Sequence, residues 1–240
     1  MRSVGCNHSA QGWYFGGIDS SFGGTFKDEE VLIETGIGDI VHCLMGDITD
    51  AYEMLKDEVS KLPSNDFRSV SNAILRVVCN YFGDYSNVSH RMDYYTPDDF
   101  VESDADIGRV ADLKGKNAAM CVERSMLSQN LLQSLGFESY YKATGVINNG
   151  KNDVHAFNLV KDKDKYYLFD ATIPAEYDGE MTPIITELPE DVYNTLKSPL
   201  SKDGYSVVVS HYNPLRDLDV EITYDAGREN VLDTTNMKSK

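Results

Sequence analysis

Helical and strand patterns follow one another along this chain in an order that leaves few architectures open. Apolar residues recur every three to four positions in three segments, which predicts helices over 47–62, 66–83 and 117–135. Strand-like patterns are found mainly later in the chain, at 139–147, 153–160, 165–171, 205–211 and 218–224. Three helices followed by strands that short turns connect favour an α+β protein whose helices pack on an antiparallel sheet.

The chain divides into three parts by pattern. Residues 1–46 are predicted to form an N-terminal extension of loops and short strands, residues 47–226 the main domain, and residues 227–240 a polar tail. A domain of this size buries enough surface to hold a site rigidly without disulfides. Within it, residues 84–115 are acidic and turn-rich, and so long a link is usually functional or partly disordered. Prolines predict a loop after the third of the later strands, followed by a short helix near 190–196.

The charge balance excludes several classes of partner. Lys and Arg number 22 against 39 Asp and Glu, a formal net charge of −17. Binding to a phosphate backbone or to an anionic membrane surface needs clustered cations, so we expect neither nucleic acid nor a membrane as partner. The sequence has no apolar run of transmembrane length and no signal-peptide core, which favours a cytoplasmic protein; non-classical secretion stays open.

Four scattered cysteines form no CxxC pair, so we expect reduced thiols: Cys6, Cys43, Cys79 and Cys121. Among them, only Cys121 lies in the first turn of a long predicted helix. Unpaired N–H groups and the positive end of the helix dipole favour an anion there, which raises the thiolate fraction of a thiol. Cys121 is therefore the candidate nucleophile, whereas Cys79 is expected in the core.

A thiolate nucleophile needs a base, and the base needs an orienting carboxylate. The later strands supply both. A hairpin that turns on Asp162-Lys163 would place His155 directly opposite Asp170, on one face of the sheet and within side-chain reach. Cys121, His155 and Asp170 are thus the predicted site.

Three pieces of sequence, in this order, support the same triad: Cys121-Val122-Glu123 with the later Leu135-Gly136-Phe137, then His155-Ala156-Phe157-Asn158, then Phe169-Asp170-Ala171-Thr172. Over residues 110–175 they resemble the transglutaminase-like superfamily of cysteine enzymes. Two positions depart from that family's pattern. Ala119 stands where the family usually has Gly, and Phe157 stands where it usually has Trp.

The resemblance implies a transglutaminase-like or papain-like cysteine enzyme fold over residues 47–226. It implies Cys121 as nucleophile, His155 as general base and acid, and Asp170 as the residue that orients the imidazole. The N–H group of Cys121, with Asn117 as the candidate second donor, would bind the oxyanion. The implied activity is that of an amide hydrolase, a peptidase or glutamine deamidase, which acts on a protein or peptide through a thioester without a cofactor.

Three alternatives stay open. The same triad can transfer the acyl group to an amine, as in a transglutaminase or acyltransferase, if an amine rather than water reaches the thioester. The fold can also serve as a non-catalytic peptide-binding module. A metal-dependent enzyme would have to use Cys6, His8 and His42, but no second pair of ligands with zinc-like spacing is present, so no metal is expected.

Overall fold

The computed structural model of this chain describes these residues: 2–3, 20–27, 31–34, 40–83, 108–148, 151–177, 180–197, 205–213 and 218–226. Within them, the side chains that it describes belong mainly to residues 21–27, 44–83, 109–143, 155–172 and 185–197. The predicted polar tail, residues 227–240, lies outside the described residues.

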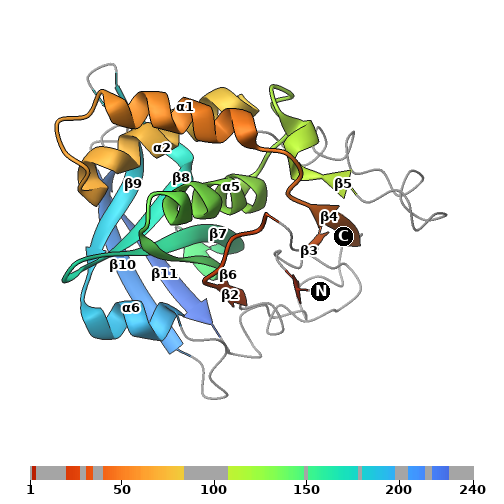
Figure 1. Ribbon diagram of the computed structural model, residues 1–240. Helices are drawn as coiled ribbons and strands as arrows, with labels where there is room; N and C mark the ends of the chain where they lie inside the picture. The colour runs from red at the N-terminus through yellow and green to blue at the C-terminus, as the bar shows by residue number, and fades with distance from the viewer. Residues whose placement is uncertain are drawn as a thin grey trace.

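The larger of two sheets is antiparallel throughout and confirms the predicted α+β class (Figure 1). Its strands lie in the order β10 (Tyr205–Asn213), β11 (Leu218–Ala226), β6 (Glu138–Asn148), β7 (Lys151–Asp162), β8 (Lys165–Tyr177) and β9 (Glu180–Leu188), and β2 (Ser20–Phe22) also pairs with β6. The two edge strands, β9 and β10, approach each other, so the sheet curls towards closure.

A smaller sheet contains four short strands in the order β1 (Arg2–Ser3), β3 (Val31–Glu34), β4 (Ile40–Leu44) and β5 (Gly108–Arg109). The strands β3 and β4 lie before residue 46, in the part of the chain where short strands were expected. Part of the long segment 84–115 is ordered as well, because β5 leads into the 3-10 helix η2 (Val110–Leu113). Residues 84–107 lie outside the described part of the chain.

Helices cover both faces of the larger sheet. On one face lie α1 (Thr49–Ser60), α2 (Phe67–Phe82) and α5 (Cys121–Ser134), and in Figure 1 α5 lies between α1 and the strands. The larger hydrophobic cluster fills this side and includes Leu55, Phe67, Ile74, Leu131 and Phe169. On the other face, α6 (Glu190–Lys197) covers the smaller cluster, which contains Phe157, Leu159, Leu168, Leu188, Tyr193 and Leu196.

Local capping residues set the ends of α2 as predicted. The side chain of Asp66 accepts a hydrogen bond from the N–H of Ser69 at 2.9 Å, which satisfies one of the free donors of the first turn. Gly83, at φ +82°, ends the helix, and its N–H donates to the carbonyl of Cys79. At this φ a side chain is strained, so glycine suits the position.

The helix α5 begins four residues later than predicted, at Cys121 instead of Asn117. Asn117 has φ +53°, which is incompatible with a right-handed helix. Its N–H donates to the carbonyl of Phe82 at 3.0 Å, so the segment before Cys121 docks on the end of α2 instead of winding into α5. The other end is as predicted, because Gly136 adopts φ +83° in a Schellman motif.

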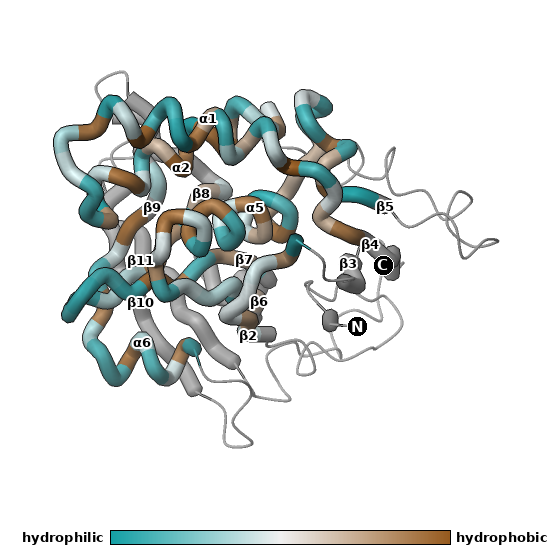
Figure 2. The backbone as a smooth tube through the Cα atoms, in the orientation of Figure 1, coloured by the Kyte–Doolittle hydropathy of each residue, from teal (hydrophilic) through white to brown (hydrophobic). Residues whose placement is uncertain are grey.

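The helix α5 is enclosed on all sides, which the prediction of a single apolar stripe missed. Every residue from Cys121 to Leu132 is buried, including polar ones, and Figure 2 shows hydrophilic and hydrophobic residues mixed along it. The polar side chains bind neighbouring elements. Asn130 accepts from the N–H of Phe26 at 2.7 Å, and Gln129 donates to the carbonyl of Ser139 at 2.9 Å.

The strand β9 corrects the predicted proline-rich loop after β8. A proline lacks the N–H that a ladder needs, but an edge strand tolerates it on its unpaired side or at a bulge. The strand β9 is an edge strand, and its pairing with β8 shifts register around Pro183, between the pairs Asp170–Ile184 and Ala175–Thr182. Among the described residues, no helix is both long and apolar enough to cross a membrane.

Candidate active site

Cys121 is the first residue of α5, so it lies at the helix N-terminus as predicted. Met120 precedes it in an extended conformation, and the Met120 N–H donates to the Glu123 carboxylate at 3.0 Å. This bond closes the first turn around Cys121 and satisfies a donor that the helix leaves free. The Cys121 side chain is 9% exposed, so the thiol lies at the edge of the core rather than deep within it.

His155 on β7 and Asp170 on β8 are in direct contact. The Nε2 atom of His155 lies 2.5 Å from Oδ2 of Asp170. The other carboxylate oxygen, Oδ1, accepts the N–H of Thr172 at 2.8 Å. Both oxygens of the buried carboxylate are therefore occupied, and together they fix the orientation of the imidazole ring.

The side chain of Cys121 forms a hydrogen bond with His155, which brings all three predicted site residues together. Because Asp170 holds Nε2, the ring nitrogen left for the thiol is Nδ1. The ring of the fully buried Phe157 lies nearly parallel to that of His155, at 6.4 Å between centroids.

The predicted hairpin register is wrong by two residues. The turn lies on Lys163-Asp164, and the ladder runs from Asp162–Lys165 to Asn158–Phe169. His155 is therefore not directly opposite Asp170. Because the error is an even number, both residues keep the same face of the sheet, and their side chains meet diagonally where the ladder ends.

Charge interactions within the buried group move both pKa values away from their usual range. Burial by itself lowers the pKa of His155, but the carboxylate of Asp170 and the side chain of Cys121 outweigh it and raise that pKa well above 6.5. Burial raises the pKa of Asp170, but His155 and the N–H of Thr172 lower it further than burial raises it. The arrangement therefore favours an imidazolium ion between two negative groups.

Asn117, the candidate second oxyanion donor, lies four residues before α5 and not at its start. Its side chain lies against Gly83, where an added Cβ would come 2.0 Å from Oδ1 of Asn117. A role for it in binding an oxyanion stays a prediction. The N–H of Cys121 belongs to the first turn of the helix, the part of α5 from which N–H groups point away from the helix.

The residues of the alternative metal site are only partly described. Cys6 and His8 lie outside the described residues, and His42 belongs to β4, where the structure describes the backbone. Among the side chains that are described, no three potential metal ligands form a group. Cys79 is partly buried on α2 and packs against the larger hydrophobic cluster, as expected.

Arg124 was not among the predicted site residues, but it lies three residues after Cys121 in α5 and is only 1% exposed. A signal was present in the sequence. An arginine in a helix that packs against the rest of the domain must either reach solvent or bind several acceptors inside. The structure shows the second outcome, because its guanidinium donates to two backbone carbonyls.

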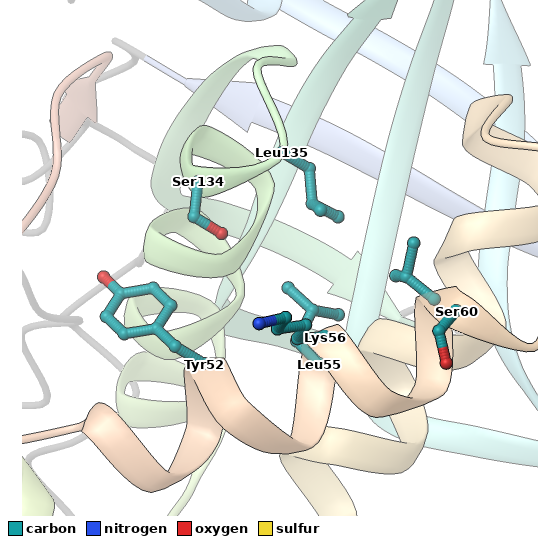
Figure 3. Close-up of a pocket in the computed structure, with 7 residues that line it drawn as sticks. Tyr52, Leu55, Lys56, Ser60, Ser134 and Leu135 are labelled. Carbon is teal, nitrogen blue, oxygen red and sulfur yellow. The ribbon is translucent and has the colours of Figure 1, made fainter.

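A separate apolar groove of about 610 Å³ lies between α1 and the far end of α5. Figure 3 shows it lined by Tyr52, Leu55, Lys56, Ser60, Ser134 and Leu135. Because α5 has 14 residues, its two ends are about 20 Å apart. The groove is thus at the opposite end of the helix from Cys121.

The hydrogen bond between Cys121 and His155 predicts an unusual pH dependence of alkylation. The thiolate fraction of an ordinary thiol falls roughly 150-fold between pH 8.5 and pH 6. We expect the rate at Cys121 to fall by less than about tenfold, because the raised pKa of His155 keeps its ring positive and the ring stabilises the thiolate. Iodoacetamide labelling at the two pH values, read peptide by peptide in a mass spectrometer, gives this ratio.

The same labelling contains its own controls. In protein unfolded by urea all four thiols should show the ordinary 150-fold fall. If Cys121 in the folded protein loses reactivity at pH 6 as steeply as the thiols of the unfolded protein do, its thiol is not activated.

The chain matches no protein-family model and no curated protein.

Proposed function

We propose that this protein is a cysteine-dependent amide hydrolase of the transglutaminase-like type, of the peptidase or deamidase kind. The observation that carries the proposal is the position of the His155 ring, which contacts Asp170 on one side and Cys121 on the other. A thiol at one ring nitrogen and a carboxylate at the other is the arrangement that a cysteine nucleophile needs from its base.

The contacts of the three side chains support one order of events. The Cys121 thiolate attacks the carbonyl carbon of the amide, and the new C–S bond leaves an oxyanion near the N–H of Cys121. His155 gives its Nδ1 proton to the departing nitrogen as the C–N bond breaks. Water then attacks the thioester, His155 takes the proton, and the Cys121 thiolate leaves, which restores the starting state.

Two further features support the transglutaminase-like assignment. The nucleophile begins a helix enclosed against the sheet, while the histidine and the aspartate lie on consecutive antiparallel strands, β7 and β8. This is the arrangement of the family that the sequence resembles. The family acts on peptide bonds or on glutamine side chains, so a protein or peptide is the proposed substrate.

Incubation with glutamine-containing peptides, with and without a fluorescent primary amine, tests the proposal. We expect release of ammonia or of a cleaved peptide. Hydrolysis should exceed incorporation of the amine, because water is always available to the thioester. Incorporation of the amine in excess of hydrolysis would show a transferase instead. Peptide binding without turnover, equal in the wild type and in Cys121→Ala, would show a binding module.

A further inference from the structure

The buried side chain of Arg124 links the start of α5 to the end of α2. It follows Cys121 by three residues in the first turn of α5. Its Nη2 atom donates to the carbonyl of Gly83 at 2.5 Å, and its Nε atom donates to the carbonyl of Ala119 at 3.3 Å. Nη1 lies 3.9 Å from the sulfur of Cys79. The guanidinium thus contacts backbone on both sides of the junction between the helices.

Backbone hydrogen bonds complete this junction. The N–H groups of Gly115 and Asn117 donate to the carbonyls of Tyr81 and Phe82, at 2.8 and 3.0 Å. Together with Arg124, they provide donors for the carbonyls of three consecutive residues at the C-terminus of α2. That end of a helix carries a partial negative charge, which stabilises a buried cation beside it. The segment that leads to Cys121 is therefore docked at successive points.

We propose that Arg124 is a positioning residue of the site, an inference that rests on the proposed function. By holding the carbonyls of Gly83 and Ala119 together, it fixes where α5 begins, and so it fixes the direction in which Cys121 points towards His155. A guanidinium donates in several directions at fixed angles, so it serves two carbonyls that a single ammonium group does not hold in the same geometry. The role depends on this geometry more than on the charge.

Two substitutions separate geometry from charge. Arg124→Met removes both, and Arg124→Lys keeps the charge. We expect each to lower the alkylation rate of Cys121 at pH 6, relative to its rate at pH 8.5, by roughly 10- to 100-fold, because a small displacement of the thiol breaks its contact with His155. Arg68→Met, which changes an exposed arginine on α2, should leave the ratio unchanged. Thermal melting of each variant verifies that the labelled protein is folded.

A third variant tests the same junction without changing Arg124. Gly83→Ala places a Cβ against the side chain of Asn117 at a residue with φ +82°, so the strained backbone of residue 83 or the side chain of Asn117 must move. We expect this movement to disturb the junction and to lower the alkylation rate of Cys121 at pH 6, relative to its rate at pH 8.5, as well. If Arg124→Met fails to fold, Arg124→Lys and Gly83→Ala decide the outcome.

The possible results distinguish the two proposals. A wild-type Cys121 with the pH profile of an ordinary thiol would overturn both. An activated wild type with an unchanged profile in folded Arg124→Met would overturn the role of Arg124 alone. A purely structural role would lower the melting temperature and leave the profile of the folded protein unchanged. Full restoration by Arg124→Lys would assign the effect to charge and overturn the geometric role.

Discussion

Turnover of an amide substrate is expected to fall by at least about 10⁴-fold when Cys121 is replaced by alanine. The substitution removes the atom that forms the thioester. The cost in stability should be small, because only one sulfur atom is lost at the edge of the core, where the side chain is 9% exposed. Product release by chromatography and thermal melting of the same samples measure the two effects.

Cys79→Ala is the matched control, since it removes a thiol from the neighbouring helix α2. It should leave turnover close to that of the wild type. Retention of more than a small fraction of turnover in Cys121→Ala would contradict a thioester mechanism and would require a different nucleophile.

We expect Asp170→Asn to lower turnover by about 10²- to 10⁴-fold. The two oxygens of Asp170 accept from two donors, the Nε2 atom of His155 and the N–H of Thr172. Asparagine has one oxygen, so in either orientation its amide NH₂ faces one of these donors. The histidine also loses the negative charge that raises its pKa, so the rate of Cys121 alkylation at pH 6 should fall together with turnover.

The same variant should change how the free energy of unfolding depends on pH. The raised pKa of His155 stabilises the folded protein fully below about pH 6.5, and this contribution disappears as the pH rises through the raised value. The lowered pKa of Asp170 contributes above about pH 3.8, and its contribution disappears as the pH falls through the lowered value. The free energy of unfolding of the wild type should therefore exceed that of Asp170→Asn most between about pH 3.8 and pH 6.5. Denaturant titrations at several pH values measure this difference.

Asp164→Asn, in the turn between β7 and β8, is the matched control for this substitution. It removes a carboxylate from the same hairpin, and its residue is exposed in the turn. Turnover and the pH dependence of unfolding should both resemble those of the wild type. Equal pH profiles for wild type and Asp170→Asn would mean that the contact between Asp170 and His155 does not control the state of the ring.

The hairpin between β7 and β8 illustrates how far the site was predictable. Its turn sequence, Asp162-Lys163-Asp164-Lys165, alternates charges and contains no Asn-Gly or Asp-Gly pair that would mark one centre. Turns centred one residue apart are therefore equally compatible with it. Side chains alternate between the two faces of a strand, so a register error of two residues leaves each side chain on its original face. The prediction that His155 and Asp170 share one face was therefore correct, although the predicted register was not.

The helix α5 illustrates the opposite case, in which local pattern was misleading. Residues 117–120 look compatible with a helix, but the end of α2 binds them, and Asn117 takes a left-handed conformation. The burial of its polar residues was also not predictable, because their partners come from remote segments such as residues 20–27. Contacts of this kind override a local preference of a few tenths of a kcal/mol per residue.

Short-range chemistry determined the capping of α2 by Asp66, the glycine ends of α2 and α5, the class of the fold, and which cysteine begins a helix. These features depend on a few neighbouring residues and on the period of the apolar pattern, so the chain alone specifies them. Tertiary structure alone decided the register of the β7–β8 hairpin, the start of α5 and the contacts of Arg124. The last two join segments far apart in sequence, and the register is a choice between near-equal turns. The energies that select among these alternatives arise only when the segments pack together.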